Sequence, residues 1–138
     1  LDAAGASVSA VKPGKLKGTT LSFPAKKSGK NFTHKGGFSI TNAGGTSLTL
    51  TKLVVNSKNG KVSATATAPL PDPIPLDNVL VVTGGKKSAK GWKNGKLKLA
   101  KSFDFGGNAT NPAELIGQIL QIQLKTGQTI GKINISVK

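Results

Sequence analysis

Few residues in this chain have side chains that could bind a metal ion or catalyse a reaction. Among its 138 residues there is one histidine, His34 in the stretch NFTHKGGFSI, and there is no cysteine. A zinc site takes three or four soft or imidazole ligands, which one histidine without cysteine does not supply. The sequence also lacks a D-x-D-x-D-G run that would indicate a calcium-binding loop. We therefore expect no metal site.

The acidic residues do not form an obvious catalytic pair. Glycoside hydrolysis needs two carboxyl groups that face each other across the substrate. Only Asp77 and Asp104 lack a simpler explanation as terminal, turn or helix-capping residues, and nothing in the sequence brings these two together. No serine stands in the G-x-S-x-G context of a nucleophile elbow. We predict that the protein is not an enzyme.

Positive charge is the strongest chemical feature of the sequence. Twenty basic residues, all of them lysine, stand against five acids and give a net charge of +15. Arginine supplies the planar fork that reads guanine edges, whereas lysine acts as a hydrated point charge. This composition argues against sequence-specific recognition of nucleic acids. It favours diffuse attraction to a polyanion such as an anionic cell-wall polymer or glycan.

The lysines gather in two segments, one before residue 36 and one around Trp92. We predict that a polyanion binds through Lys26, Lys27, Lys30, Lys35, Lys86, Lys87, Lys90, Trp92 and Lys93. An exposed Trp92 could stack on a sugar or a base while the lysines neutralise the anionic chain. The alternative is that the Trp92 ring packs into the core and the lysines only solvate loops.

Alternation of apolar and polar residues predicts the strands that must position these groups. Val62, Ala64 and Ala66 lie on one face of KVSATATA, and GKINISVK closes the chain in the same manner. The alternation in SLTLTKLVV breaks at Lys52, where we expect a β-bulge. Turn residues at NAGG and SKNG predict hairpins. The expected fold is all-β: a single β-sandwich domain of antiparallel strands over residues 1–138.

One short helix is expected near residues 111–121. Asn111 has the side chain of an N-cap, and Pro112 suits the first helical position. Leu115, Ile116 and Ile119 belong to the apolar stripe of this helix.

The start of the sequence and its composition suggest an exported protein. The chain has no methionine, so we interpret Leu1 as the start of a processed mature protein or of a trimmed chain. No apolar run approaches the roughly 18 residues that cross a bilayer, so we expect no transmembrane segment. A small, cysteine-free chain rich in Ser, Thr and Gly is typical of bacterial exported proteins. We predict a secreted or cell-envelope location.

Residues 21–66, LSFPAKKSGKNFTHKGGFSITNAGGTSLTLTKLVVNSKNGKVSATA, resemble secreted domains of the HtaA type from Actinobacteria. The closing NPAELIGQIL and LKTGQTIGKINISV resemble the end of the same family. This resemblance implies a β-sandwich with a small helix. Haem-binding members hold iron with a tyrosine assisted by a histidine. His34 matches that histidine position, but the chain contains no tyrosine, so His34 is interpreted first as a scaffold residue whose ring pins the hairpin.

These observations predict a non-catalytic domain that acts by surface interaction with an anionic polymer and needs no cofactor. Two alternatives stay open. One is a haem-binding or haem-transfer module that uses His34. The other is a self-associating extracellular structural subunit, a homo-oligomer in which the charge keeps the monomer soluble.

Overall fold

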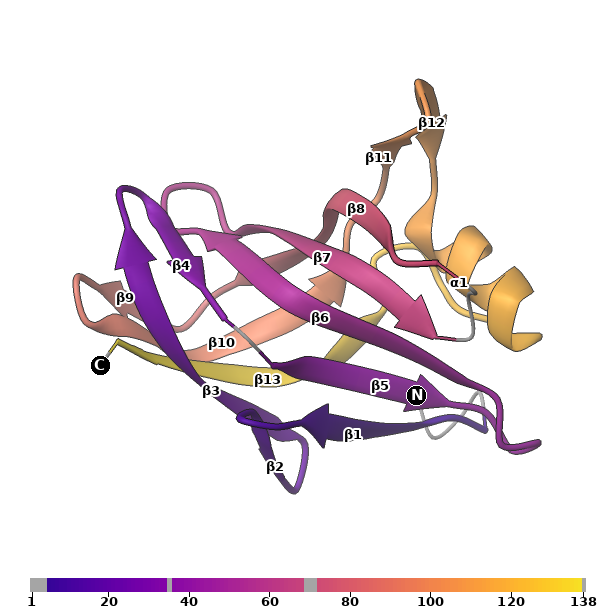
Figure 1. Ribbon diagram of the computed structural model, residues 1–138, viewed down its shortest axis with the longest axis horizontal. Helices are drawn as coiled ribbons and strands as arrows, with labels where there is room; N and C mark the ends of the chain where they lie inside the picture. Colours follow the sequence, from indigo (N-terminus) through magenta and orange to yellow (C-terminus); the bar gives the residue numbers. More distant parts are fainter. Residues whose placement is uncertain (1–4, 35, 69–71, 138) are drawn as a thin grey trace.

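Residues that alternate between apolar and polar form the strands of one large sheet. The computed structural model describes residues 5–34, 36–68 and 72–137 of the chain. The alternating apolar residues point inward as predicted: Leu21, Val62 and Ile133 are fully buried, and Ala64 is 2% exposed. The chain is therefore all-β with one short helix (Figure 1).

Seven strands of this sheet close into a barrel. In order around the barrel, each strand pairs with the next and the last pairs with the first: β6 (Ser47–Asn56), β4 (Asn31–Thr33), β3 (Thr20–Ser28), β13 (Thr129–Val137), β10 (Gly91–Leu99), β8 (Ile74–Thr83) and β7 (Lys61–Ala68). The seam between β3 and β13 joins strands from near the two ends of the chain, with Leu21 opposite Ile133.

Closure makes the prediction of a sandwich of antiparallel strands wrong in two respects. The sheet forms one closed surface where two facing sheets were expected, and β3 and β13 run parallel to each other. Both differences have the same cause. Alternation along a strand specifies which of its faces is buried, but not which strand lies beside it.

The bulge predicted at Lys52 is confirmed and divides β6 into two halves. Lys52 has a positive φ of 54°, and the register of β6 with β7 shifts between Thr51 and Val54. The half before the bulge pairs with β5 (Gly37–Thr41), and the half after it pairs with β4. The bulge thus marks the point where one edge of β6 changes partner from β5 to β4, while β7 pairs with the other edge on both sides of the bulge.

The remaining strands of the described chain lie outside the ring of seven. They are β1 (Ser7–Val11), which pairs with β5; β2 (Lys15–Lys17), which pairs with β3; β9 (Lys86–Ser88), which pairs with β10; and the separate hairpin of β11 (Phe103–Phe105) and β12 (Asn108–Thr110). Figure 1 shows the β11–β12 hairpin standing away from the barrel near the helix.

The helix α1 (Pro112–Leu120) lies within the predicted range. The Asn111 side chain accepts a hydrogen bond from the Ala113 backbone N–H at 2.9 Å, which is the expected N-cap. At the other end of α1, the Asn42 amide donates to the Leu120 carbonyl at 2.7 Å. Asn42 belongs to the predicted NAGG turn between β5 and β6, so the helix is tied to the sheet at its C-terminus.

Candidate functional site

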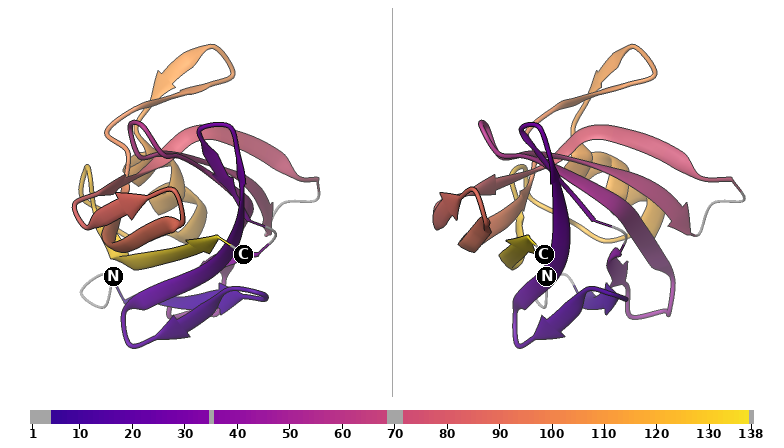
Figure 2. Two further views of the ribbon diagram at one scale, coloured as in Figure 1. Left: turned by 90° about the vertical axis from the view of Figure 1, so that its left-hand side faces the viewer. Right: turned by 60° about the vertical axis from the view of Figure 1, so that its left-hand side comes forward.

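Three hairpin turns meet at one end of the barrel. The Ser57 N–H, in the β6–β7 turn, donates to the Lys30 carbonyl of the β3–β4 turn at 2.8 Å. The Lys87 ammonium of β9 donates to the Ser57 and Lys58 carbonyls at 2.6 and 3.2 Å. The Val137 N–H of β13 donates to the Lys90 carbonyl in the β9–β10 turn. The left view of Figure 2 looks onto this end.

This convergence brings the two predicted lysine segments together. The turns and the strand ends beside them carry nine exposed lysines, which we call the lysine-rich end: Lys26, Lys27, Lys30, Lys58, Lys61, Lys86, Lys87, Lys90 and Lys93. Seven of these are predicted binding residues, although more than fifty positions separate Lys30 from Lys86 in the sequence. Lys35, the remaining predicted lysine, lies outside the described residues.

The sequence prediction missed Lys58 and Lys61. Lys58 lies within the SKNG turn and Lys61 directly follows it. This turn was identified as a hairpin but not as part of a binding surface. Hairpin turns at the same end of a barrel lie close together, so a lysine beside any of these turns is a candidate for the same surface. A lysine next to a predicted hairpin turn was therefore the signal that could have assigned Lys58 and Lys61 to this surface.

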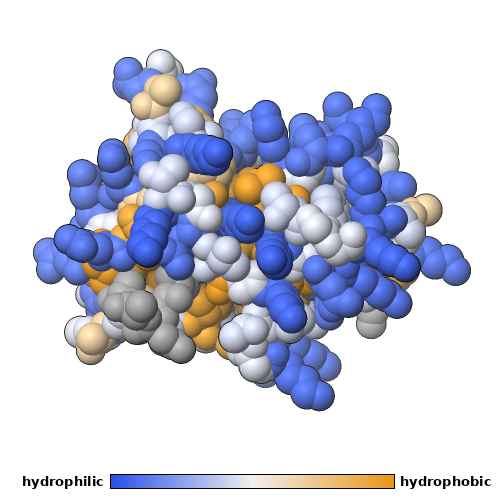
Figure 3. Space-filling view, turned by 180° about the vertical axis from the view of Figure 1, so that it is seen from behind, coloured by the Kyte–Doolittle hydropathy of each residue, from blue (hydrophilic) through white to orange (hydrophobic). Residues whose placement is uncertain are grey.

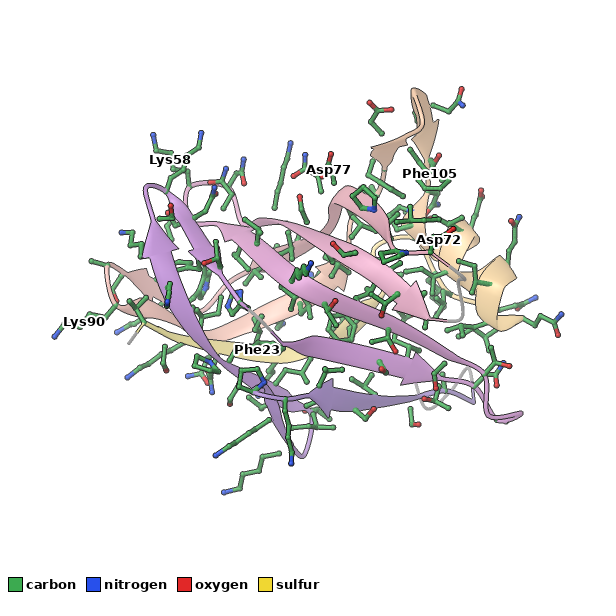
Figure 4. All side chains as sticks on the ribbon, in the orientation of Figure 1. Phe23, Lys58, Asp72, Asp77, Lys90 and Phe105 are labelled. Atoms are coloured by element: carbon green, nitrogen blue, oxygen red, sulfur yellow. The ribbon has the colours of Figure 1, made fainter. Side chains whose placement is uncertain are left out.

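The described acidic residues lie outside the three turns. Residues 26–33, 54–63 and 86–93, which contain the three turns, include no Asp or Glu. Figure 4 shows Lys58 and Lys90 at the lysine-rich end, with Asp77 and Asp72 further toward the end that carries α1. Asp104 belongs to β11 and Glu114 to α1. Among the described residues, the three turns thus carry lysines and no acidic side chain.

Like charges also face each other directly across the β9–β10 hairpin. Lys86 is the register partner of Lys93 in this antiparallel pair, and both side chains are exposed. Directly opposed like charges destabilise a sheet. This pair therefore weakens the hairpin, and it concentrates positive charge where an anionic ligand could relieve the repulsion.

Trp92 belongs to the core, so its predicted stacking on a sugar or a base is wrong. The side chain is 6% exposed, and its indole N–H donates to the Gly84 carbonyl at 2.9 Å. The Lys87 ammonium lies 5.6 Å from the centroid of the Trp92 ring. The buried Trp92 ring thus packs beneath the surface of the lysine-rich end, and neither of its faces is free for a ligand.

His34 lies apart from this surface and holds the bulge of β6. The Leu53 carbonyl, next to Lys52, accepts both the His34 backbone N–H and the ring Nδ1–H, each at 2.9 Å. A carbonyl only accepts, so Nδ1 carries the proton of the neutral ring and Nε2 carries the lone pair. Among the described residues Nε2 is buried without a hydrogen-bond partner.

Burial favours the neutral form of the His34 ring. The side chain is 6% exposed and packs edge-on against Phe23, with ring centroids 5.4 Å apart. Removal from water lowers the pKa of His34 below 6.5, and the hydrogen bond to Leu53 opposes this shift only in part. The His34 ring nitrogen thus holds strand β6. The scaffold interpretation had expected this nitrogen to hold the hairpin.

Groups suited to metal chemistry do not cluster in the part of the chain that the structure describes. Residues 5–34, 36–68 and 72–137 contain no set of three or more His, Asp or Glu side chains placed to hold a metal ion. Within the same ranges no helix is long and apolar enough to cross a membrane.

Comparison with known proteins adds no relative from which a function could be inferred. The chain matches no family model, no curated protein and no solved structure. The resemblance to HtaA-type domains stays a prediction.

Proposed function

We propose that the protein binds an anionic polymer of the bacterial cell envelope, a cell-wall polymer or a glycan, through the lysine-rich end of the barrel. The observation that carries this proposal is the meeting of three hairpin turns that bring nine exposed lysines to one end. No chemical step is needed for such a role. The protein would act as a non-catalytic binding domain at the cell envelope or outside the cell.

The physical basis of binding is the release of counter-ions. A polyanion holds condensed cations, which return to bulk solution when lysines take their place. A lysine side chain contributes a hydrated point charge and imposes no fixed hydrogen-bond geometry on its ligand. Affinity should therefore depend on charge density more than on the sequence or stereochemistry of the polymer. Because the Debye length falls to about 3 Å at 1 M salt, binding should weaken steeply as salt rises.

Lys87 has a second role at this surface. Its ammonium holds the β6–β7 turn against β9 through the Ser57 and Lys58 carbonyls. Replacing Lys87 would therefore disturb the surface as well as remove a charge. A clean test of the charge leaves Lys87 in place.

The test compares two variants with the same net charge. One replaces Lys58, Lys86, Lys90 and Lys93 with Gln, and the other replaces the exposed residues Lys15, Lys17, Lys101 and Lys125 with Gln. Each lowers the net charge by four from +15. Retention on isolated bacterial cell envelope is then measured by co-sedimentation across a salt series.

The proposal expects the variant of the lysine-rich end to lose about tenfold or more in affinity at low salt and to show a shallower salt dependence. For nucleic acids each lost phosphate contact reduces the log–log slope by about 0.7–0.9. The second variant should remain near the unmodified protein. Equal losses in the two variants would contradict a localised surface, and no retention at any salt would contradict polyanion binding.

The two alternatives from the sequence, a haem-binding or haem-transfer module and a self-associating subunit, stay predictions. A visible absorption band on haem titration that vanishes in His34→Ala would support the first. A rise in mass with protein concentration in the absence of ligand would support the second.

A further inference from the structure

A cavity lies toward the end of the molecule that carries α1, away from the lysine-rich end. It has a volume of about 160 Å³. Its lining includes Leu48 of β6, Ile74 and Leu76 of β8, Phe105 of β11, and Ile116 and Ile119 of α1. The barrel, the helix and the β11–β12 hairpin thus each contribute a wall. Figure 4 shows Phe105 at this end, opposite Lys58 and Lys90.

The chemistry of the cavity favours hydrocarbon over water. Every residue that lines it has an apolar side chain. A buried water molecule needs two to four polar partners, and apolar cavities of about 150 Å³ stay dry and bind benzene or xenon. A cavity of this size and lining is therefore suited to a compact hydrocarbon group.

The exposure of the lining residues indicates how such a group could enter. Leu48 and Ile116 are fully buried, whereas Ile74, Phe105 and Ile119 are only partly buried. Phe105 belongs to the β11–β12 hairpin, which pairs with no other strand of the described chain. The cavity therefore has a buried side that includes Leu48 and Ile116 and a side near the surface that includes Ile74, Phe105 and Ile119.

Other hollows on the described chain have mixed linings: one of about 230 Å³ includes Ser7 and Thr19, and one of about 360 Å³ includes Lys15 and Ser22. No large hydrophobic side chain of the described residues is exposed, and Figure 3 shows hydrophilic side chains over most of one face with small apolar areas between them. A larger hollow of about 690 Å³ lies along α1, but its lining includes Glu114, Lys125 and several glutamines. That hollow has the character of a hydrated surface depression.

We propose that the cavity between β6, β8, β11 and α1 is a binding site for a compact hydrocarbon group of about six carbon atoms. The group would be a small free molecule or the end of a longer neutral chain. This site is separate from the lysine-rich end, and its existence does not depend on polyanion binding.

The test uses toluene as the probe and two matched substitutions, one in α1 and one just after its C-terminus. Ile119→Phe adds side-chain volume inside the cavity. Ile122→Phe makes the same change at a partly buried residue that lines the larger hollow. Toluene is titrated into the full chain and the two variants, and binding is followed by chemical-shift changes and by the rise in Tm that a ligand specific for the folded state produces.

The expected result is saturable binding to the full chain, at least tenfold weaker binding to Ile119→Phe, and nearly unchanged binding to Ile122→Phe. Absence of saturable binding, or equal binding to both variants, would overturn the proposal. If Ile119→Phe does not fold, as judged by circular dichroism, Leu115→Phe fills the same cavity and takes its place.

A second arm distinguishes the two sources of the hydrocarbon. Octanol is chosen because it is neutral, so the lysines do not attract it as they would a fatty-acid anion. Displacement of toluene by octanol supports the version in which the end of a chain enters. Toluene binding that octanol does not displace supports the version limited to small free molecules.

Discussion

Trp92 and His34 are the two residues whose roles depend most on burial. Both were candidates for direct contact with a ligand, and both have 6% of their surface exposed. Each donates a ring N–H to a backbone carbonyl, Trp92 to Gly84 and His34 to Leu53. Their aromatic rings therefore stabilise local structure, and their contribution to binding is expected to be indirect.

Replacing Trp92 should lower stability without weakening the folded protein's binding to cell envelope. Trp92→Leu removes core volume and the hydrogen bond to Gly84, so we expect a loss of about 2–4 kcal/mol in the free energy of unfolding. Urea unfolding followed by circular dichroism measures this, since the variant lacks the only tryptophan. A tenfold loss of envelope binding by the folded variant would instead support stacking on Trp92.

His34 should make stability depend on pH just below neutrality. Burial lowers its pKa in the folded state, whereas in the unfolded chain the pKa is about 6.5. As pH falls below about 6.5 the unfolded chain gains a proton that the folded chain does not. The free energy of unfolding therefore falls, by at most about 1.4 kcal/mol per pH unit, until the folded pKa is passed.

The matched variant for this prediction is His34→Asn, which keeps an N–H donor for Leu53 but does not titrate. Denaturant unfolding of both proteins between pH 7 and 5 provides the measurement, because His34 is the only histidine. The unmodified protein should lose stability over this range and the variant should not. The same slope in both would show that His34 is not the titrating group.

At the scale of elements, the β9–β10 hairpin combines a binding surface with an unfavourable charge pair. Lys86 faces Lys93 across this hairpin, and Lys96 faces Lys132 further along, between β10 and β13. All four side chains are exposed. The two pairs have the same composition but different positions, so they separate the effect of charge repulsion from the effect of location.

Lys93→Glu and Lys96→Glu should affect stability alike and binding differently. Each replaces a like-charge pair by an opposite-charge pair, so we expect a gain of about 0.2–1 kcal/mol in the free energy of unfolding. Lys93→Glu should weaken envelope retention at low salt several-fold more than Lys96→Glu. Thermal unfolding measures the change in stability, and co-sedimentation measures the change in binding. Equal losses of retention in the two variants would place the binding surface elsewhere.

At the scale of the whole molecule, closure of the barrel determines which strands have free edges. β13 lies between β10 and β3, and β3 in turn pairs with β4 and β2. In the described chain β1 pairs only with β5, so its second edge has no strand partner. A sandwich would place strands like β13 and β3 at the edges of separate sheets.

Amide hydrogen exchange should therefore distinguish the closed barrel from a sandwich. Backbone amides of Ile133, Asn134 and Ile135 in β13 should exchange slowly at consecutive positions, because alternate amides bond to strands on opposite sides. Amides of β1 should show the slow–fast alternation of an edge strand. Alternating protection in β13 would contradict closure at the seam with β3.

Local patterns in the sequence correctly predicted the parts of the fold that depend on neighbouring residues. The inward residues of β7 and β13, the Asn111 N-cap, the two hairpin turns and the bulge at Lys52 all follow from alternation and turn chemistry over a few positions. The excess of lysine, and with it the proposal of an anionic partner, is likewise a property of composition.

Only the tertiary structure decided how those parts meet. The pairing of Leu21 with Ile133 closes the barrel. Hydrogen bonds from Ser57 to the β3–β4 turn and from Lys87 of β9 to the β6–β7 turn assemble the lysine-rich end. The burial of Trp92 and the cavity beside α1 likewise follow only from the tertiary structure. The physical reason is that the alternation of apolar and polar residues along a strand determines which of its faces is buried. Which strands lie beside it depends on contacts between residues far apart in the chain.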